Sequence, residues 1–457
     1  MVESTGFENR HSGNRIEGSN PSLSVMTMNK IPLKEVFGIS SEVPKYTYVD
    51  RQGLDELFEY YLESQKHIVV HGASKQGKSC LRKKKINEET SLIIQCLPRM
   101  EKMEEIWKTA LEKAGVLRPS GGSTTKTAGG TMTAELSGQA KLPFVASIET
   151  KGSAEMTDSS SEVEERDAIQ ADSFLPQLAH YLRENNKRLI LEDFHYLPDE
   201  VRKEIAFGLK ALYEEKAYVV IVGIWSEQNL ITYYNGDLTG RIEEINLTWN
   251  KAELAQVLSK GEGALNIEFA AGLKNQLIES TFDNVGLLQR LAEKICIDSK
   301  IFETSKEKQV ISDIELLKTA RSQLVSDIRQ RYNRITEVFR DGMRSDAVLL
   351  LYARIYNALL EAADIELISG ISYDDLFNRI QKDASNVTVR TSDLTSALDK
   401  VERLQARKGV TPLLVSYSKD LRKLFLNDRE FMFYRKYSGD NIKDLKISLD
   451  ENGSGDL

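Results

Sequence analysis

The sequence has few cysteines and no long hydrophobic run. Among its 457 residues, the 3 cysteines are Cys80, Cys96 and Cys296. They are widely spaced and odd in number, which excludes a disulfide framework and offers no zinc-binding spacing. The longest apolar runs, such as Tyr218 to Ile224, are the size of a strand and far shorter than a transmembrane helix. The composition therefore indicates a reducing compartment and no transmembrane segment, and we expect a cytoplasmic protein.

An excess of positive charge is also absent. The formal net charge of -8 argues against a protein whose whole surface binds nucleic acid, although it leaves room for a local basic patch. Residues 1–30 are rich in Ser, Asn and Gly and lack the apolar core of a signal peptide, so we expect a disordered tail there. The length predicts about two to four domains.

The stretch from His67 to Leu81 predicts a buried strand, a glycine-bounded loop and the start of a helix. Within it, Gly72 to Ser79 matches the phosphate-binding pattern G-x-x-x-x-G-K-[ST], in which Lys78 reaches the outer phosphates and the last hydroxyl binds Mg²⁺. The helix N-terminus adds a partial positive charge. We therefore expect a nucleotide to bind at this loop. The candidate binding residues are Gly72, Ala73, Ser74, Lys75, Gln76, Gly77, Lys78, Ser79 and Cys80.

An acidic strand that this loop requires follows at Leu189 to Asp193. A carboxylate at the end of a neighbouring strand holds Mg²⁺ directly or through water, and a second one polarises the attacking water. By register, Glu192 takes the magnesium position together with Ser79, and Asp193 takes the water position. The common order of the two acids is Asp then Glu, and here it is reversed. The alternative is that both are surface acids that cap the next helix.

Strands and helices alternate around these motifs. We expect further strands at Ser91 to Leu97, Tyr218 to Ile224 and Gly240 to Trp249, with helices between them. This alternation predicts a three-layer α/β fold, in which a parallel sheet lies between helices. The predicted P-loop core covers 31–249, a helical lid 250–300 and a helical connector 301–341. The basic run from Arg82 to Lys85 is typical of a solvated helix face.

An insertion over 119–161 interrupts the core and is dominated by Gly, Ser and Thr. Apolar residues alternate with polar ones from Met132 to Ile148, which is a period of two with one apolar face. The stretch is too long for one strand and Pro143 interrupts it, so we expect an amphipathic β-hairpin. Its apolar face packs on its own domain, on a neighbouring subunit, or on a membrane or another partner.

The C-terminal part has its own pattern. Three helices are expected at Ala347 to Ala362, Tyr373 to Gln381 and Thr391 to Ala406. Two short strands follow, at Pro412 to Tyr417 and Leu421 to Leu426. Three helices and a hairpin indicate a winged helix over 342–438, and the polar residues 439–457 are expected to form a loose tail.

From Lys45 to Lys300 the chain resembles the AAA+ and STAND families of P-loop ATPases. The motifs that carry the resemblance are Tyr48-Val-Asp-Arg51, Gly72 to Ser79, Leu189 to Asp193, the strand Val219 to Ile224, and Asp237-Leu-Thr-Gly-Arg-Ile242. The resemblance implies that ATP and Mg²⁺ lie between the core and the lid, and that the chain forms a homo-oligomer. It also implies that Arg241 enters a neighbour's site as an arginine finger. The alternative is that Arg241 is a surface residue at the start of a strand.

The lid departs from these families. It has no Gly-x-Pro sequence, and Arg290 lies one helical turn beyond the place of a sensor arginine. A slow regulatory switch ATPase is therefore as compatible with this chain as a motor.

Several ATPases of these classes end in a winged helix, which reads DNA by placing its third helix in the major groove. The candidate phosphate contacts are Lys400, Arg403, Arg407, Lys419, Arg422 and Lys423. Asp393, Asp399 and Glu402 in the third helix would repel DNA, so the partner is either double-stranded DNA or a protein. Two hypotheses follow: an oligomeric switch that binds and slowly hydrolyses ATP, or a nucleotide-bound DNA-binding or scaffold protein without significant turnover.

Overall fold

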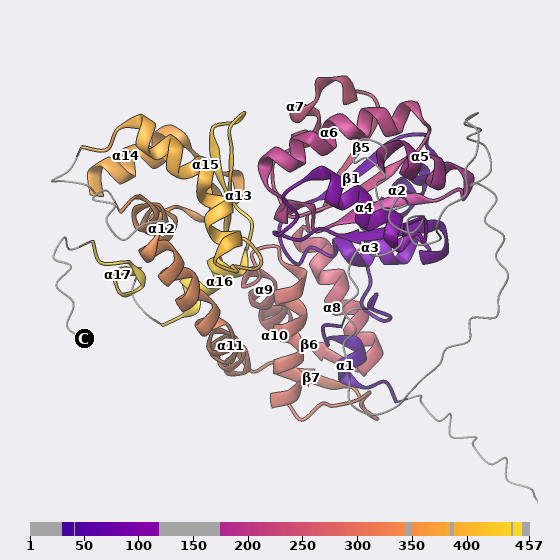
Figure 1. The fold of residues 1–457 in the computed structure, drawn as a ribbon. Helices are drawn as coiled ribbons and strands as arrows, with labels where there is room; N and C mark the ends of the chain where they lie inside the picture. Colours follow the sequence, from indigo (N-terminus) through magenta and orange to yellow (C-terminus); the bar gives the residue numbers. More distant parts are fainter. Residues whose placement is uncertain are drawn as a thin grey trace, which may run out of the picture.

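The computed structural model describes residues 30–40, 42–117, 174–342, 350–383, 388–439 and 442–449. The insertion over 119–161, with its predicted hairpin, lies outside these residues, as does the predicted tail over 1–30 apart from Lys30. Figure 1 shows three groups of elements: an α/β domain, a helical region below it, and a group of helices with short strands at its side.

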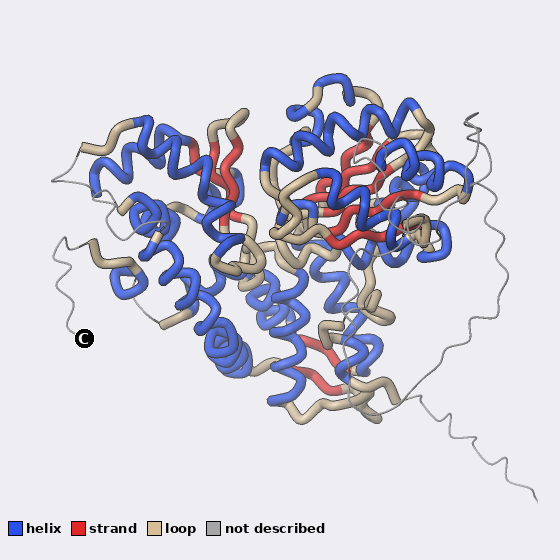
Figure 2. Tube along the Cα trace, in the orientation of Figure 1, coloured by secondary structure: helices blue, strands red, loops and turns tan. Residues whose placement is uncertain are grey.

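The α/β domain is built on a five-stranded parallel sheet with the strand order β2-β3-β4-β1-β5. Its strands are β1 (His67–His71), β2 (Ser91–Gln95), β3 (Arg188–Glu192), β4 (Val219–Val222) and β5 (Ile242–Asn246). The central strands are nearly continuous runs of Val, Ile and Leu because both faces of the sheet are covered. In Figure 2 these strands run through the middle of the domain.

Helices cover both faces of this sheet. On one face α2 (Leu54–Glu63) and α3 (Lys78–Lys85) contribute Phe58 and Leu81 to a cluster with Ile68. The other face carries α4 (Met103–Lys113), α5 (Phe174–Glu184), α6 (Asp199–Glu214) and α7 (Leu230–Tyr234). Successive residues of a strand point to opposite faces, so Ile68 and Val69 lie in different clusters. The predicted three-layer α/β fold is confirmed.

The lid and connector are mainly helical. They consist of α8 (Lys251–Leu265), β6 (Ile267–Phe269), α9 (Ala271–Glu279), α10 (Val285–Asp298), β7 (Gln309–Ile311) and α11 (Ile314–Asp341). A capping box between Asn250 and Glu253 begins the lid, because each residue's side chain accepts a hydrogen bond from the other's backbone N–H. The parallel pair β6 and β7 was not predicted, since strands of 3 residues are too short to show a pattern.

The segment before the α/β domain belongs to the lid. Helix α1 (Leu33–Val36) and the following Phe37 share the hydrophobic cluster of α8, and a Cβ at Gly261 would lie 2.2 Å from the Phe37 ring. The backbone N–H of Leu33 also donates to the carbonyl of Phe302 at 2.8 Å. The predicted core boundary at residue 31 therefore differs from the packing, because apolar contacts assign this segment to the lid.

The C-terminal group contains the expected helices and hairpin. Its elements are α12 (Leu351–Glu361), α13 (Asp364–Ser369), β8 (Ile371–Ser372), α14 (Tyr373–Asp383), α15 (Thr391–Arg407), β9 (Val415–Ser418), β10 (Lys423–Leu426), α16 (Glu430–Tyr437) and α17 (Ile442–Leu445). The three strands form an antiparallel sheet in the order β8-β10-β9. The winged-helix interpretation stays a prediction.

Part of the expected C-terminal tail is packed. Ile447 is buried, and its backbone N–H donates to Asn357 Oδ1 at 2.9 Å while its carbonyl accepts from Asn357 Nδ2 at 3.0 Å. The prediction of a loose tail is wrong for residues 442–449, because one apolar side chain in a polar stretch anchors it to α12.

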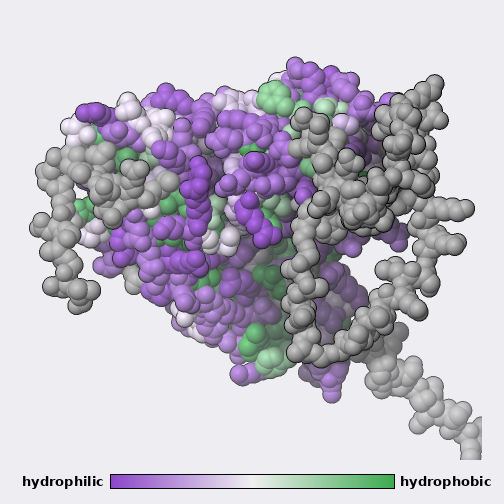
Figure 3. All heavy atoms as spheres, in the orientation of Figure 1, coloured by the Kyte–Doolittle hydropathy of each residue, from purple (hydrophilic) through white to green (hydrophobic). Residues whose placement is uncertain are grey.

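The face drawn in Figure 3 is mostly hydrophilic where the described residues form it, with a small apolar area at the lower end of the lid. Within the described ranges, no helix has both the length and the apolar character needed to span a bilayer.

Candidate nucleotide-binding site

The phosphate-binding loop joins the end of β1 to the start of α3. Gly72 and Gly77 have φ values of 139° and 86°, a region that favours glycine. A Cβ at Gly72 would lie 2.5 Å from the carbonyl oxygen of Leu247, so a larger residue cannot fit there. The loop thus has the tight curvature that points backbone N–H groups at an anion.

Lys78 is the buried cation of this loop. Its Nζ donates to the carbonyl oxygens of Gly72 at 3.0 Å and Ala73 at 2.6 Å. Burial lowers the pKa of Lys78 to about 7, against the opposing charges of Asp193 and Glu192. A phosphate at the loop would favour the charged ammonium further, because an adjacent anion stabilises a cation.

The two predicted acids lie at the end of β3, close enough to Lys78 to affect its charge. Glu192 is buried and its Oε1 accepts from Arg82 Nε at 2.7 Å. Asp193 follows at a positive φ of 55° and accepts a hydrogen bond from Gln95. Burial raises the pKa of both carboxyl groups, while Arg82 opposes this at Glu192 and the hydrogen bond from Gln95 opposes it at Asp193. The structure therefore brings Lys78, Glu192 and Asp193 together, and their separate roles stay predictions.

Arg82 was missed as a site residue. It was assigned to a solvated face, yet it is 6% exposed and bonded to Glu192. It follows Lys78 by one helical turn, and residues spaced by four share a helix face. That spacing was the signal available in the sequence. Lys84 is 37% exposed and pairs with Asp55, whereas Lys85 is 13% exposed and pairs with Glu59.

Ser79 and Cys80 differ in their surroundings. Ser79 is exposed in the first turn of α3, where a hydroxyl can reach a metal ion beside the phosphates. Cys80 is half-buried, and burial raises the pKa of its thiol. The glycine curvature, Lys78, Ser79 and the two acids together fit a nucleotide with Mg²⁺.

Residues ahead of the sheet support the loop from one side. Arg51 Nη1 donates to the carbonyl oxygen of Gln76 at 3.2 Å, and Trp249 Nε1 donates to the same oxygen at 3.1 Å. The Arg51 guanidinium lies 4.3 Å from the centre of the Trp249 ring. The Tyr48 to Arg51 motif thus fixes the loop through its arginine.

The lid contacts the loop from another side. Gln76 Nε2 donates to the carbonyl oxygen of Asp283 at 3.0 Å, and Asn284 Nδ2 donates to that of Ser74 at 3.3 Å. A Cβ at Gly286 would lie 3.1 Å from the Cβ of Lys75. The loop therefore lies between the sheet and the lid.

The C-terminal group also contacts the loop. Ser74 N–H donates to the carbonyl oxygen of Asn427 at 2.9 Å, and Lys75 Nζ lies 2.6 Å from Glu430 Oε1. No local pattern could have revealed these contacts, because 355 positions separate Lys75 from Glu430.

Two more contacts join the C-terminal group to the α/β domain. Arg202 of α6 pairs with Glu402 of α15 at 2.7 Å, and Ser418 Oγ donates to Glu227 at 2.6 Å. Arg202, Glu227 and Ser418 are buried. One side of α15 therefore faces the α/β domain.

His195 follows the two acids in the sequence and is buried. Burial lowers its pKa to about 3, so the ring is neutral near pH 7, and its Nδ1 accepts from the backbone N–H of Ile224 at 3.2 Å. A neutral, hydrogen-bonded ring has a packing role.

Arg241 lies where the parallel strands β1 and β5 begin, whereas the loop lies where β1 ends. Its carbonyl accepts from the N–H of His67, which begins β1, whereas the loop follows the end of β1. Its guanidinium lies 3.2 Å from Glu214 and 5.3 Å from the Tyr213 ring centre. Arg241 is therefore placed away from its own loop, and its role as an arginine finger for a neighbour stays a prediction.

The six predicted nucleic-acid contacts are spread over α15 and the β9–β10 hairpin. Lys400, Arg403 and Arg407 are exposed on α15. Lys419 lies 3.4 Å from Asp399, and Arg422 lies 3.7 Å from Asp374. Lys423, half-buried, donates to the carbonyl of Ser369 at 3.4 Å. Several of these cations already have acidic or carbonyl partners within the domain, and their binding of DNA stays a prediction.

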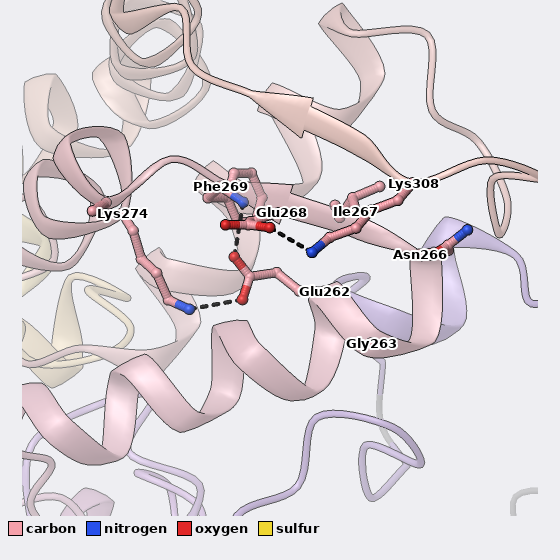
Figure 4. Close-up of a pocket in the computed structure, with 9 residues that line it drawn as sticks. Glu262, Gly263, Asn266, Ile267, Glu268, Phe269, Lys274 and Lys308 are labelled. Atoms are coloured by element: carbon pink, nitrogen blue, oxygen red, sulfur yellow. Dashed lines mark hydrogen bonds and ion pairs between the residues drawn. The ribbon is translucent and has the colours of Figure 1, made fainter.

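Two hollows accompany the lid. One, of about 630 Å³, lies between the segment around α1 and helix α10, where Arg290 and Glu293 line it. The other, of about 590 Å³, lies on the lid (Figure 4), where Glu262 pairs with Lys274 at 2.7 Å and Glu268 with Lys308 at 2.5 Å. Since its charges are neutralised in place, the second hollow adds nothing to the nucleotide site.

Comparison with solved structures finds this fold among P-loop ATPases. A Walker-type ATPase of Pyrococcus abyssi matches with a TM-score of 0.50 and 14% identity, over 88% of this chain and 99% of that chain. The Orc1 protein of Aeropyrum pernix, solved in complex with DNA, matches with a TM-score of 0.39 and 11% identity, over 91% of this chain and 98% of that chain. No protein-family model and no curated protein matches the sequence. The chain therefore shares the fold of this Walker-type ATPase.

Proposed function

We propose that this chain is an oligomeric regulatory switch ATPase of the AAA+ and STAND type that binds ATP with Mg²⁺ and hydrolyses it slowly. The observation that supports this best is the position of Lys78, between the carbonyls of the glycine loop and the charges of Asp193 and Glu192. Ser79 and Glu192 would hold Mg²⁺, which would supply positive charge that neutralises the outer phosphates.

Each group of the chain has a proposed task. The loop N–H groups and Lys78 orient the phosphates, Ser79 and Glu192 hold the metal, and Asp193 positions the attacking water. Glu192 must loosen its contact with Arg82 to do so, and this exchange favours slow turnover. Arg241 of a neighbouring subunit would complete the site.

The substitution Lys78→Ala tests the proposal directly. We expect it to abolish ATP binding in a titration with a fluorescent ATP analogue, because the loop loses its only buried cation among the described residues of 72–80. Lys108→Ala is the matched control, since Lys108 forms only a 4.0 Å pair with Glu112 on the surface of α4. Unchanged binding by the Lys78 variant would overturn the proposal.

Turnover should depend on assembly if Arg241 acts on a neighbour. We expect phosphate release per protomer to rise with protein concentration, and Arg241→Ala to remove this rise while ATP binding persists. A rate per protomer that stays constant in the wild type argues against an arginine finger.

The second candidate is a nucleotide-bound scaffold without significant turnover. The contact between Glu402 of α15 and Arg202 of α6 favours protein docking over DNA binding by this helix. Phosphate release measured with and without duplex DNA separates the candidates: stimulation by DNA favours the DNA-binding switch, and absent turnover in both favours the scaffold.

A further inference from the structure

The segment from Asn427 to Glu430, called here the latch segment, connects the C-terminal group to the rest of the molecule. It lies between β10 and α16, and Asn427, Asp428 and Glu430 are each 0% exposed. It contacts the phosphate-binding loop, the lid and the connector at once.

The latch segment occupies hydrogen-bond donors of the phosphate-binding loop. The Asn427 carbonyl accepts a hydrogen bond from the N–H of Ser74 at 2.9 Å, and the Glu430 carboxylate forms an ion pair with the ammonium of Lys75 at 2.6 Å. Backbone N–H groups and cations of such a loop are the donors that bind phosphate. An anion arriving at the loop therefore competes with a carboxylate and a carbonyl from the same chain.

Glu430 also forms ion pairs with cations outside the loop. Its carboxylate lies 3.0 Å from Arg290 of the lid and 3.0 Å from Arg331 of α11. Burial alone would raise its pKa, but Lys75 and Arg331 hold the pKa of Glu430 below its usual value. The carboxylate is thus a charged group shared by three parts of the chain.

Arg429 and Asp428 fix the latch segment on both sides. Arg429 Nη1 donates to the carbonyl of Phe282 at 3.3 Å, next to the lid residues that contact the loop. Asp428 Oδ2 accepts from Tyr332 Oη at 2.9 Å on α11. The latch segment therefore has one defined position between lid and connector.

Some buried polar atoms lack hydrogen-bond partners where the C-terminal group meets the α/β domain. Among the described residues, the buried side-chain atoms of this junction that have no hydrogen-bond partner include Gln76 Oε1, Arg202 Nε and Asn427 Nδ2. Buried polar groups normally have partners, and each one that lacks a partner lowers the stability of the state that buries it. This raises the free energy of the closed junction and makes its opening easier.

We propose that the latch segment competes with the terminal phosphate of a nucleoside triphosphate for the phosphate-binding loop. Binding of the triphosphate at the loop displaces the Asn427 carbonyl and the Glu430 carboxylate, and so releases the C-terminal group from the α/β domain. Lys75 and Arg290 then pass from carboxylate to phosphate. This inference rests on the proposed function, because it requires that ATP binds at this loop.

The first test weakens the competitor without removing its shape. In Glu430→Gln the side chain is neutral and still accepts hydrogen bonds, so we expect ATP to bind at least about fivefold more tightly, a typical coupling between two sites. The gain should be smaller for ADP, which lacks the terminal phosphate. Glu361→Gln is the control, since Glu361 pairs with Lys446 on the surface. Unchanged or weaker ATP binding by Glu430→Gln would overturn the inference.

The second test locks the C-terminal group against the α/β domain. Glu227→Cys and Ser418→Cys are combined, because Ser418 Oγ lies 2.6 Å from Glu227 Oε1 and neither residue belongs to the 72–80 loop. The single variant Ser418→Cys, oxidised in the same way, controls for the native cysteines, among them the half-buried Cys80. We expect the oxidised double variant to lose ATP binding and the reduced one to regain it.

The outcomes separate the two proposals. Equal ATP binding by the oxidised and reduced forms contradicts the latch segment as a competitor, while nucleotide binding itself stands. Absence of ATP binding in the wild type and in the reduced variant contradicts the proposed function instead.

Discussion

Two buried glutamates of this molecule respond to burial in opposite ways. Glu192 ends a strand of the sheet and pairs with Arg82 at 2.7 Å. Glu430 lies in the latch segment and pairs with three cations, which are Lys75, Arg290 and Arg331. Burial raises the pKa of Glu192, whereas the cations around Glu430 hold its pKa below the usual value.

The difference lies in the number and origin of the partners. One arginine from the same domain does not compensate for the desolvation of Glu192. An approaching divalent cation would therefore stabilise the charged form of this carboxylate. Three cations from the loop, the lid and the connector do compensate at Glu430, so this carboxylate holds the parts together. We infer that Glu192 is suited to exchange partners and Glu430 to join domains.

The largest expected effect concerns the acids at the end of β3. We expect Asp193→Asn to slow ATP hydrolysis by about 10² to 10⁴-fold with little loss of ATP affinity, because a water-positioning carboxylate acts mainly in the chemical step. Glu192→Gln should instead weaken the dependence of binding on Mg²⁺. Phosphate release and a magnesium titration of ATP binding measure the two. A reversed result would exchange the roles of the two acids.

Removal of the Glu430 carboxylate should destabilise the fold. Glu430→Ala leaves three cations without their shared anion, and breaking a buried ion pair costs about 3–5 kcal/mol. Chemical denaturation checks this as a fall in the unfolding free energy. Glu430→Gln should lose less because the amide oxygen still accepts hydrogen bonds. If the Ala variant is as stable as the wild type, Glu430 does not join the domains.

The same two glutamates should give opposite pH dependences of stability. The usual pKa is 4.5 for both. Below that value Glu430 loses its stabilising charge as pH falls through its lowered pKa, because the unfolded state binds the proton more readily. Glu192 binds a proton more readily when folded, so its contribution to stability rises as pH falls from its raised pKa toward 4.5.

Unfolding free energies of the wild type and of Glu430→Gln and Glu192→Gln, measured from pH 7 downward, check these signs. The difference between the wild type and Glu430→Gln should shrink below pH 4.5. The difference in unfolding free energy between the wild type and Glu192→Gln should change between the raised pKa of Glu192 and pH 4.5. Parallel curves for the two variants would contradict the contrast between the sites.

The conformation of the glycine loop and the place of the two acids at the end of β3 could be predicted because each is a short, contiguous pattern. The acidic strand expected from Leu189 to Asp193 is β3, which runs from Arg188 to Glu192. Gly72 and Gly77 occupy the positive-φ positions that the pattern requires. Such features depend on neighbours along the chain, which the sequence displays directly.

The latch segment could not be predicted because its partners are distant along the chain. The run Phe431 to Tyr434 is largely aromatic and lies within α16, where Phe431 packs on Tyr332 of α11. The pairing of Glu430 with Lys75 follows from how the lid and connector place α16 against the loop. No periodic pattern in the sequence around Lys75 or around Glu430 predicts that contact.

The smallest expected effect concerns an ion pair that lacks the burial of Glu430. Glu361 and Lys446 pair with side chains that are 48% and 27% exposed. Exposed pairs contribute about 0–1 kcal/mol because water screens both charges. Glu361→Gln should therefore leave the unfolding free energy unchanged within about 0.5 kcal/mol, and its salt dependence should match that of the wild type. A loss as large as that of Glu430→Ala would mean that the C-terminal group depends on surface charge in general, and that burial and multiple cations do not set Glu430 apart.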